Sequence, residues 1–294
     1  MTGSLFRYNS LPNLTIDGNG HTINGDLTFA LKINLTLKDI SIQGSDNREA
    51  IRFNNSSEGS RLITSGTVAI TGGKGKGGLG FSGSAGVYSN ADLTITASDK
   101  TTITAGDADE EFNFSLSAVW VERGSLTLDG GSPTFRGGKG YSSYGANVGK
   151  TENPGDLIIT SGSPVFKGSS FSDTGIDGAN VTGTIRISSA GSPQFIGADG
   201  RGDSARANGA RALNLEITAG TPIFKGGSAS SSESYLYAGH GISLSDSATI
   251  SNDTSPIFTG GDGATQECGG SGLLFTGGIT ISTSGDVTFT GGSN

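Results

Sequence analysis

The chain has 294 residues, a formal net charge of −8, 51 glycines and a single cysteine. Abundant Gly disfavours long helices, and the acidic balance argues against nucleic acid or an anionic membrane as a partner. An internal disulfide is excluded because there is only one Cys. Apolar residues make up only 33% of the chain, but Ile, Leu, Val and Phe recur at regular intervals, so we expect a folded protein.

The first 49 residues carry a tight form of an alternating pattern. In LTIDGNGHTINGDLTFALKINLTLKDISIQG (14–44), apolar and polar residues alternate in runs separated by Gly and Asn. Alternation with a period of two is typical of strands with one buried face, so we expect tight coils over 1–49. The opening LTIDGNGHTI (14–23) resembles the first coil of pectin-lyase-like β-helices, a group that contains both enzymes and adhesins.

From residue 50 to residue 294 the sequence repeats with a period of about 30 residues. Each later unit ends in a Phe-containing segment such as SPVFKGS, and these Phe residues lie 29 to 34 positions apart at Phe135, Phe166, Phe195, Phe224, Phe258 and Phe289. Ile70 and Ile103 fill the same slot upstream. Alternating segments such as LTITA (93–97) precede the Phe segments, and short segments such as GVYS (86–89) come earlier still.

Three short strands in each unit predict an all-β, single-stranded parallel β-helix. One unit cannot bury its own apolar face, but units stacked about 4.8 Å apart pair every strand and bury a continuous column of side chains. We therefore expect one continuous domain over 1–294, with about nine to ten coils of roughly 30 residues and three strands per coil. The six Phe residues are predicted to form an inward ladder, and Gly is expected at corners that need a positive φ.

The loops that follow the Phe segments differ in length and form the predicted binding side. Four tyrosines in them are candidate contact residues: Tyr141, Tyr144, Tyr235 and Tyr237. One loop also contains Arg201, Gly202 and Asp203, which with Ser204 spell the RGDS sequence that integrins bind. A chain of this composition would contain an RGD by chance about one time in ten, so we interpret the motif mainly as a coincidence of composition.

The stretch AGHGISLS (238–245) has the letters of a polygalacturonase-type fingerprint around His240. Glycosidic cleavage requires two carboxylates that flank the bond, and no Asp pair lies one repeat earlier, near Phe224. No Arg or Lys follows Lys225, so a downstream Arg-x-Lys is absent too. The repeat accounts for GHGI without catalysis, because it fills the slot of GANV and GARA.

The remaining candidates favour structural interpretations. The acidic run of Asp107, Asp109, Glu110 and Glu111 lies within one loop and is expected to be a solvated charged loop rather than a calcium cluster. Cys268 has no partner His or Cys in sequence, and Trp120 is expected to pack or to cap an edge. We therefore predict no catalytic residue, no metal and no cofactor.

The repeat form resembles the passenger domains of bacterial autotransporters and polymorphic outer-membrane proteins. Their Gly-Gly-Ala-Ile/Leu/Val element is matched by GANV, GARA and GSGL, and their Phe-x-x-Asn element by FRGG, FKGS, FKGG and FTGG, always without the Asn. The resemblance covers about residues 50–294 and implies a right-handed helix that is part of a longer protein, attached to a membrane only through another region.

This resemblance implies a non-enzymatic surface adhesin of an exported, virulence-related kind, located at the cell surface or outer membrane. Its expected partner is a host-cell receptor, a neighbouring cell or a glycan. The alternative is a carbohydrate-active β-helix, either a polysaccharide hydrolase or lyase or a glycan-binding module. Reducing ends or unsaturated product released from uronic-acid polymers would distinguish the two.

Overall fold

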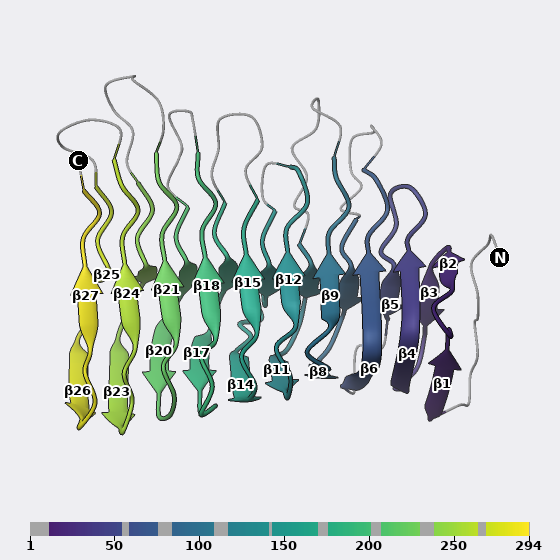
Figure 1. Cartoon of the computed structure of the whole chain (residues 1–294), viewed down its shortest axis with the longest axis horizontal. Helices are drawn as coiled ribbons and strands as arrows, with labels where there is room; N and C mark the ends of the chain where they lie inside the picture. The colour runs from purple at the N-terminus through teal and green to yellow at the C-terminus, as the bar shows by residue number, and fades with distance from the viewer. Residues whose placement is uncertain are drawn as a thin grey trace.

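The computed structural model describes residues 12–54, 59–75, 84–108, 117–140, 143–169, 176–200, 207–229, 238–263 and 269–293. These residues form 27 strands, and successive strands of each stack pair in parallel (Figure 1). No helix long and apolar enough to cross a membrane occurs in these ranges. The protein is therefore an all-β parallel solenoid with stacked coils of about 31 residues, as the repeat predicted.

Each coil contributes to three faces, which we call faces A, B and C in the order in which the chain visits them. Face A consists of β1 (Asn13–Asp17), the first parts of β4 (Asn34–Gln43) and β6 (Ser60–Thr71), β8 (Leu93–Thr96), β11 (Leu126–Asp129), β14 (Leu157–Ser161), β17 (Thr184–Ile187), β20 (Asn214–Ile217), β23 (Ala248–Asn252) and β26 (Ile279–Thr283). Face B consists of β2 (Thr22–Asn24), the last parts of β4 and β6, β9 (Thr101–Thr104), β12 (Thr134–Arg136), β15 (Val165–Lys167), β18 (Gln194–Ile196), β21 (Ile223–Lys225), β24 (Ile257–Thr259) and β27 (Thr288–Thr290). Face C consists of β3 (Leu27–Phe29), β5 (Ile51–Phe53), β7 (Val87–Ser89), β10 (Val119–Val121), β13 (Ala146–Val148), β16 (Ala179–Val181), β19 (Ala210–Ala212), β22 (Ile242–Leu244) and β25 (Leu273–Phe275).

Faces A and B are continuous in the coils of β4 and β6. The 10-residue β4 and the 12-residue β6 run through both faces and join them into one 18-stranded sheet. From β8 onward a turn separates the two faces, as at Gly162, where φ is 85° and a Cβ would lie 2.0 Å from the carbonyl oxygen of Gly131. The coils number about seven, fewer than the nine to ten predicted, and the coils of β4 and β6 lack this turn.

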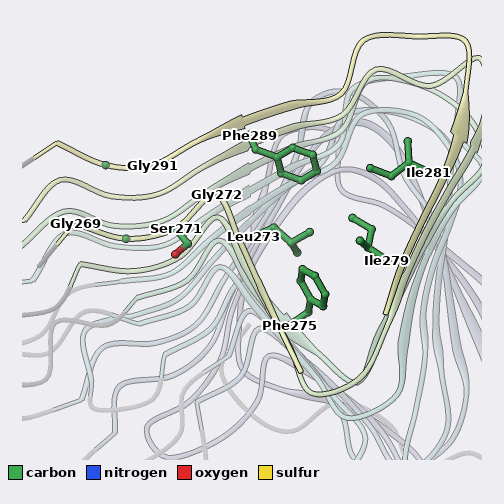
Figure 2. Close-up of a pocket in the computed structure, with 11 residues that line it drawn as sticks. Gly269, Ser271, Gly272, Leu273, Phe275, Ile279, Ile281, Phe289 and Gly291 are labelled. Atoms are coloured by element: carbon green, nitrogen blue, oxygen red, sulfur yellow. The ribbon is translucent and has the colours of Figure 1, made fainter. Parts of the chain in front are cut away.

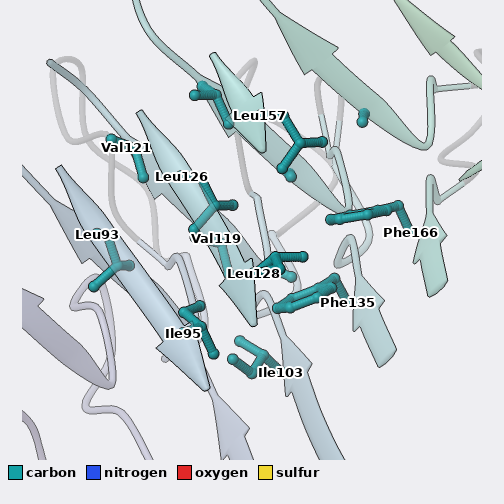
Figure 3. Packing of buried hydrophobic residues seen from close by; sticks show 14 of the residues in the cluster. Leu93, Ile95, Ile103, Val119, Val121, Leu126, Leu128, Phe135, Leu157 and Phe166 are labelled. Carbon is teal, nitrogen blue, oxygen red and sulfur yellow. The ribbon is translucent and has the colours of Figure 1, made fainter. Parts of the chain in front are cut away.

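The predicted phenylalanine ladder is confirmed. Phe135, Phe166, Phe195, Phe224 and Phe258 are fully buried, and each stacks on the next with centroids 4.6 to 5.1 Å apart. Figure 3 shows the first pair, Phe135 and Phe166. Register pairs extend the column through Ile103, Ile70 and Ile42. Stacking adds about 0.5–1.5 kcal/mol per ring pair to the burial of the rings, so this column is a main source of stability.

Faces A and C contribute further apolar columns to the core. Ile95, Leu128, Ile159, Ile187, Ile217 and Ile250 form one column on face A, and Val87, Val119, Ala146, Ala179, Ala210 and Ile242 form one on face C. All twelve are buried, while the residue between the inward positions of each strand points outward. The outward positions therefore also form columns, and these columns are the surface available for function.

Glycine before most face C strands, including every one from β13 onward, serves close packing between coils. A Cβ on Gly209 would lie 2.4 Å from the carbonyl oxygen of Gly241, and one on Gly178 would lie 2.5 Å from that of Gly209. These residues are not among those with positive φ. The prediction that Gly provides a positive φ at corners is therefore confirmed at the turn between faces A and B. Before face C, Gly is needed because a side chain would not fit between the coils.

Candidate functional site

His240 lies two positions earlier in its coil than the repeat predicted. Ile242 is in register with Ala210 of the preceding coil and Leu273 of the next. GHGI therefore aligns with GSGL (270–273) and with residues 207–210, and the predicted match to GARA (209–212) was wrong because Gly recurs at both 239 and 241. The strand itself begins only at Ile242, so His240 precedes it. The likeness to a catalytic fingerprint therefore arises from the repeat at a corner between face B and face C.

A ladder of side-chain acceptors runs through this corner, and His240 is one of its members. Asp177 Oδ1 accepts a hydrogen bond from the backbone N–H of Asn208 at 2.6 Å, and Asn208 Oδ1 accepts one from His240 N–H at 3.0 Å. His240 Nδ1 in turn accepts one from Ser271 N–H at 3.0 Å. An accepting Nδ1 carries no proton, which assigns the neutral ring with its proton on Nε2. We call these four residues the corner ladder.

Asp177 is the most buried ionisable member of the corner ladder. Burial raises the pKa of its carboxyl to about 6, although Arg211 and the hydrogen bonds from Asn208 oppose the shift. The Arg211 guanidinium lies 3.4 Å from Asp177 Oδ2 and is half-exposed. Two coils separate Asp177 from His240, a distance of about 9.6 Å along the axis at 4.8 Å per coil. The carboxylate and the imidazole therefore do not form a hydrogen-bonded catalytic pair.

The metal and acidic-cluster interpretations gain no support. No group of three or more His, Cys, Asp or Glu side chains suited to a metal ion occurs in the described part of the chain. Asp107 is exposed and accepts a hydrogen bond from the backbone N–H of Lys139 at 2.9 Å. Its predicted companions Asp109, Glu110 and Glu111 lie outside the described residues, as does Cys268.

Most predicted contact residues cannot be placed. Arg201, Gly202, Asp203, Tyr141, Tyr235 and Tyr237 all lie outside the described residues, so their proposed roles stay predictions. Tyr144 is described and half-buried, and its carbonyl oxygen accepts a hydrogen bond from the backbone N–H of Ala118 at 3.0 Å. Tyr144 precedes β13 in the same corner where Asp177 precedes β16, so it lies close to the corner ladder.

An aromatic and ionic cluster lies on the outward side of face C. The Arg52 guanidinium stands 4.1 Å from the centre of the Tyr88 ring, and Tyr88 meets Trp120 edge to face at 5.4 Å. The Tyr88 hydroxyl and the Lys150 ammonium both donate to the Glu122 carboxylate. We call these five residues the face C cluster. Trp120 packs within it, as predicted, and its side-chain Nε1 has no hydrogen-bond partner.

The ionisation of the face C cluster follows from these contacts. Burial raises the pKa of Tyr88, and the hydrogen bond to Glu122 raises it further. For Glu122, burial alone would raise the pKa, but the hydrogen bonds from Lys150 and Tyr88 outweigh it and hold the pKa below its ordinary value. At neutral pH Glu122 is thus charged and held by hydrogen bonds from Tyr88 and Lys150, which suits a structural role more than proton transfer.

A basic groove lies on the outward side of face B, and sequence reasoning missed it. It has a volume of about 710 Å³ and is lined by Thr102, Thr104, Asp107, Thr134, Arg136, Gly137, Lys139, Lys167, Gly168 and Ser169. The signal was present in the repeats FRGG and FKGS, because the residue after an inward Phe must point outward. Arg136 follows Phe135, and Lys167 follows Phe166, in adjacent coils.

The C-terminal end of the solenoid presents an apolar cavity of about 710 Å³. Figure 2 shows Leu273, Phe275, Ile279, Ile281 and Phe289 around it. Phe289 is 45% exposed, whereas the other five rings of the ladder are fully buried. The core columns therefore reach this end without a cover in the described part of the chain.

Comparison with known proteins identifies no relative of this chain. No family model, curated protein or solved structure matches it. The parallel solenoid is consequently established by the strand pairing alone, and function must be argued from the surfaces described above.

Proposed function

We propose that the protein is a non-enzymatic bacterial surface adhesin of the autotransporter-passenger kind, exported to the cell surface. The observation that carries this proposal is the commitment of His240 to the corner ladder, where its Nδ1 accepts the Ser271 N–H. This hydrogen bond gives His240 a structural task, which supports a non-enzymatic interpretation of the polygalacturonase-type fingerprint. A glycine-rich solenoid with almost no Cys and an acidic surface also suits export and exposure.

A stacked scaffold supports adhesion through repeated contacts. Outward columns on each face place equivalent side chains about 4.8 Å apart, so an extended partner can be held at several coils at once. Linking several weak contacts raises the overall affinity without any single strong site. The expected partner is a host-cell receptor, a neighbouring cell or a glycan.

The first experiment separates adhesion from catalysis. Beads coated with the purified chain are expected to attach to cells, and polygalacturonate and other uronic-acid polymers incubated with the chain should yield neither reducing ends nor unsaturated product. Turnover that disappears in His240→Ala but persists in Lys100→Ala would overturn the non-enzymatic proposal. Absence of attachment to any bacterial or animal cell type would count against adhesion itself.

The RGD segment gives the adhesin proposal a specific receptor to test. If integrins are the partner, Asp203→Glu should abolish attachment to integrin-bearing cells while leaving the stability of the solenoid unchanged. If Asp203→Glu attaches as well as the unaltered chain, the RGDS sequence is a chance occurrence. Adhesion would then depend on other surfaces of the protein.

A further inference from the structure

The face B groove brings together in one place several cations without an ion pair in the part of the chain that the structure describes. Arg136, Lys139 and Lys167 are exposed, and within the described ranges none of them forms an ion pair. On the other faces cations are commonly neutralised, as Arg186 is by Asp156 and Glu216. An unpaired cluster of like charge is unfavourable unless a ligand of opposite charge occupies it.

The cations are aligned along the solenoid axis. Arg136 of β12 is in register with Lys167 of β15, and the same column continues through Ile196 to Lys225 of β21. At about 4.8 Å per coil, Lys225 lies about 9.6 Å beyond Lys167. Successive anionic groups of one extended chain running along face B could therefore meet Arg136, Lys167 and Lys225 in turn.

The remaining lining residues favour a hydroxylated ligand. Thr102, Thr104 and Thr134 bring hydroxyl groups into the groove, and Asp107 contributes the one carboxylate. The charges of Arg136, Lys139 and Lys167 exceed that of Asp107, so the groove keeps a net positive charge within an acidic protein. Its lining contains no aromatic side chain on which a nucleic-acid base could stack.

We propose that the face B groove binds an anionic polysaccharide, with Arg136 and Lys167 on carboxylate or sulfate groups and the threonines on sugar hydroxyls. The inference rests on the proposed binding function and names its ligand class. Arg136 offers paired N–H donors that match a planar carboxylate, and Lys167 offers a mobile point charge. Because the groove is open to solvent, binding weakens as salt is added.

Binding of the intact chain to immobilised polymers tests this directly. The probes are polygalacturonate for carboxylates, dextran sulfate for sulfates, and neutral dextran as the uncharged control, each at low and at physiological salt. We expect binding to one or both anionic polymers and none to dextran. Arg136→Ala with Lys167→Ala should weaken that binding about tenfold.

A matched control removes the same charge elsewhere. Lys100→Ala with Arg123→Ala also deletes two exposed cations without an ion pair in the described structure, outside the groove. This variant should change affinity less than about twofold, because distant exposed charges are screened. The circular-dichroism spectrum and the unfolding midpoint of both variants establish that the fold is intact.

The outcomes separate this inference from the proposed function. Equal losses of polymer affinity in both double variants, or no binding of the wild type to either anionic polymer, would overturn the proposal that the groove binds a polysaccharide. Cell attachment would still support the adhesin function in that case. Groove-dependent binding of single-stranded nucleic acid in preference to both polymers would overturn the polysaccharide assignment. Cleavage of a bound polymer would overturn the proposal of a non-enzymatic function, but the groove would remain the proposed polysaccharide-binding site.

Discussion

His240 Nδ1 accepts a hydrogen bond from the backbone N–H of Ser271 at 3.0 Å, which ties one coil to the next. The equivalent residue one coil earlier, Asn208, does the same with its Oδ1 toward His240. An imidazole and a carboxamide therefore perform the same structural task at successive positions. What the slot requires is an acceptor that reaches the next corner, and several polar side chains meet that requirement.

Replacement of His240 distinguishes this role from catalysis. His240→Asn keeps an acceptor for Ser271 and is expected to change the unfolding free energy by less than about 0.5 kcal/mol, whereas His240→Ala removes it and should cost about 1 kcal/mol. Denaturant unfolding measures both values. Equal destabilisation by the two variants would show that the acceptor is not what the fold needs at this position.

The phenylalanine ladder predicts a gradient of sensitivity from the interior to the end. Phe224 is fully buried between Phe195 and Phe258, whereas Phe289 has a single ring neighbour and is 45% exposed. Phe224→Ala should cost about 3–5 kcal/mol and Phe289→Ala less than half as much. If Phe224→Ala does not fold, Phe224→Leu, at about 1–2 kcal/mol, provides the comparison. A larger cost at Phe289 than at Phe224 would contradict the ladder as the source of stability.

Sequence periodicity was sufficient for the architecture because a solenoid repeats its own constraints. The spacing of Phe135 and Phe166 predicted both their burial and their stacking, since coils of similar length place equivalent residues above one another. The number of regular coils was not predictable, because in β4 and β6 the alternation continues where later coils turn. Alternation describes which side is buried and carries little information about where a strand bends.

Surface function was less accessible from sequence for a physical reason. Arg136 and Lys139 form a groove only after stacking sets Lys167 beside them, and their lack of counterions depends on the whole surface. The face C cluster likewise assembles from residues more than 30 positions apart, such as Tyr88 and Glu122. Pattern analysis placed His240 two residues out of register, because Gly239 and Gly241 both fit the Gly of GARA and only the strand pairing shows that Gly241 is the equivalent residue.

Asp177 predicts a pH dependence of stability with a definite sign. Burial raises the pKa of its carboxyl to about 6, above the ordinary value near 3.8, so the folded chain holds a proton that the unfolded chain releases between these values. Stability should therefore fall as pH rises from about 4 to about 6, and the charged carboxylate should cost about 3 kcal/mol above that range.

Asp177→Asn tests the contribution of the Asp177 charge to stability. Asn already occupies the equivalent position of the next coil, at Asn208. The variant should be more stable than the wild type at pH 8, and the advantage should vanish near pH 4. Unfolding midpoints across pH 4–8 give the comparison, with Asp199→Asn as a control at an exposed site. An advantage that is constant across the range would show that packing, and not ionisation, is responsible.

Trp120 reports on the ionisation of Glu122, because it is the only tryptophan and shares the face C cluster with Tyr88 and Lys150. Burial acts against the charge of Glu122, but the hydrogen bonds from Lys150 and Tyr88 hold its pKa below the ordinary value. The stabilisation is thus present above about pH 4.3 and is lost as pH falls through the lowered pKa. Tryptophan fluorescence is expected to change below pH 4, and Glu122→Gln should abolish that step and lower stability at pH 7 by about 1 kcal/mol. If the fluorescence change below pH 4 persists in Glu122→Gln, another carboxylate is responsible for it. Asp129→Asn, which removes an exposed ion-pair partner of Arg61 on face A, is the control and should leave the fluorescence change in place.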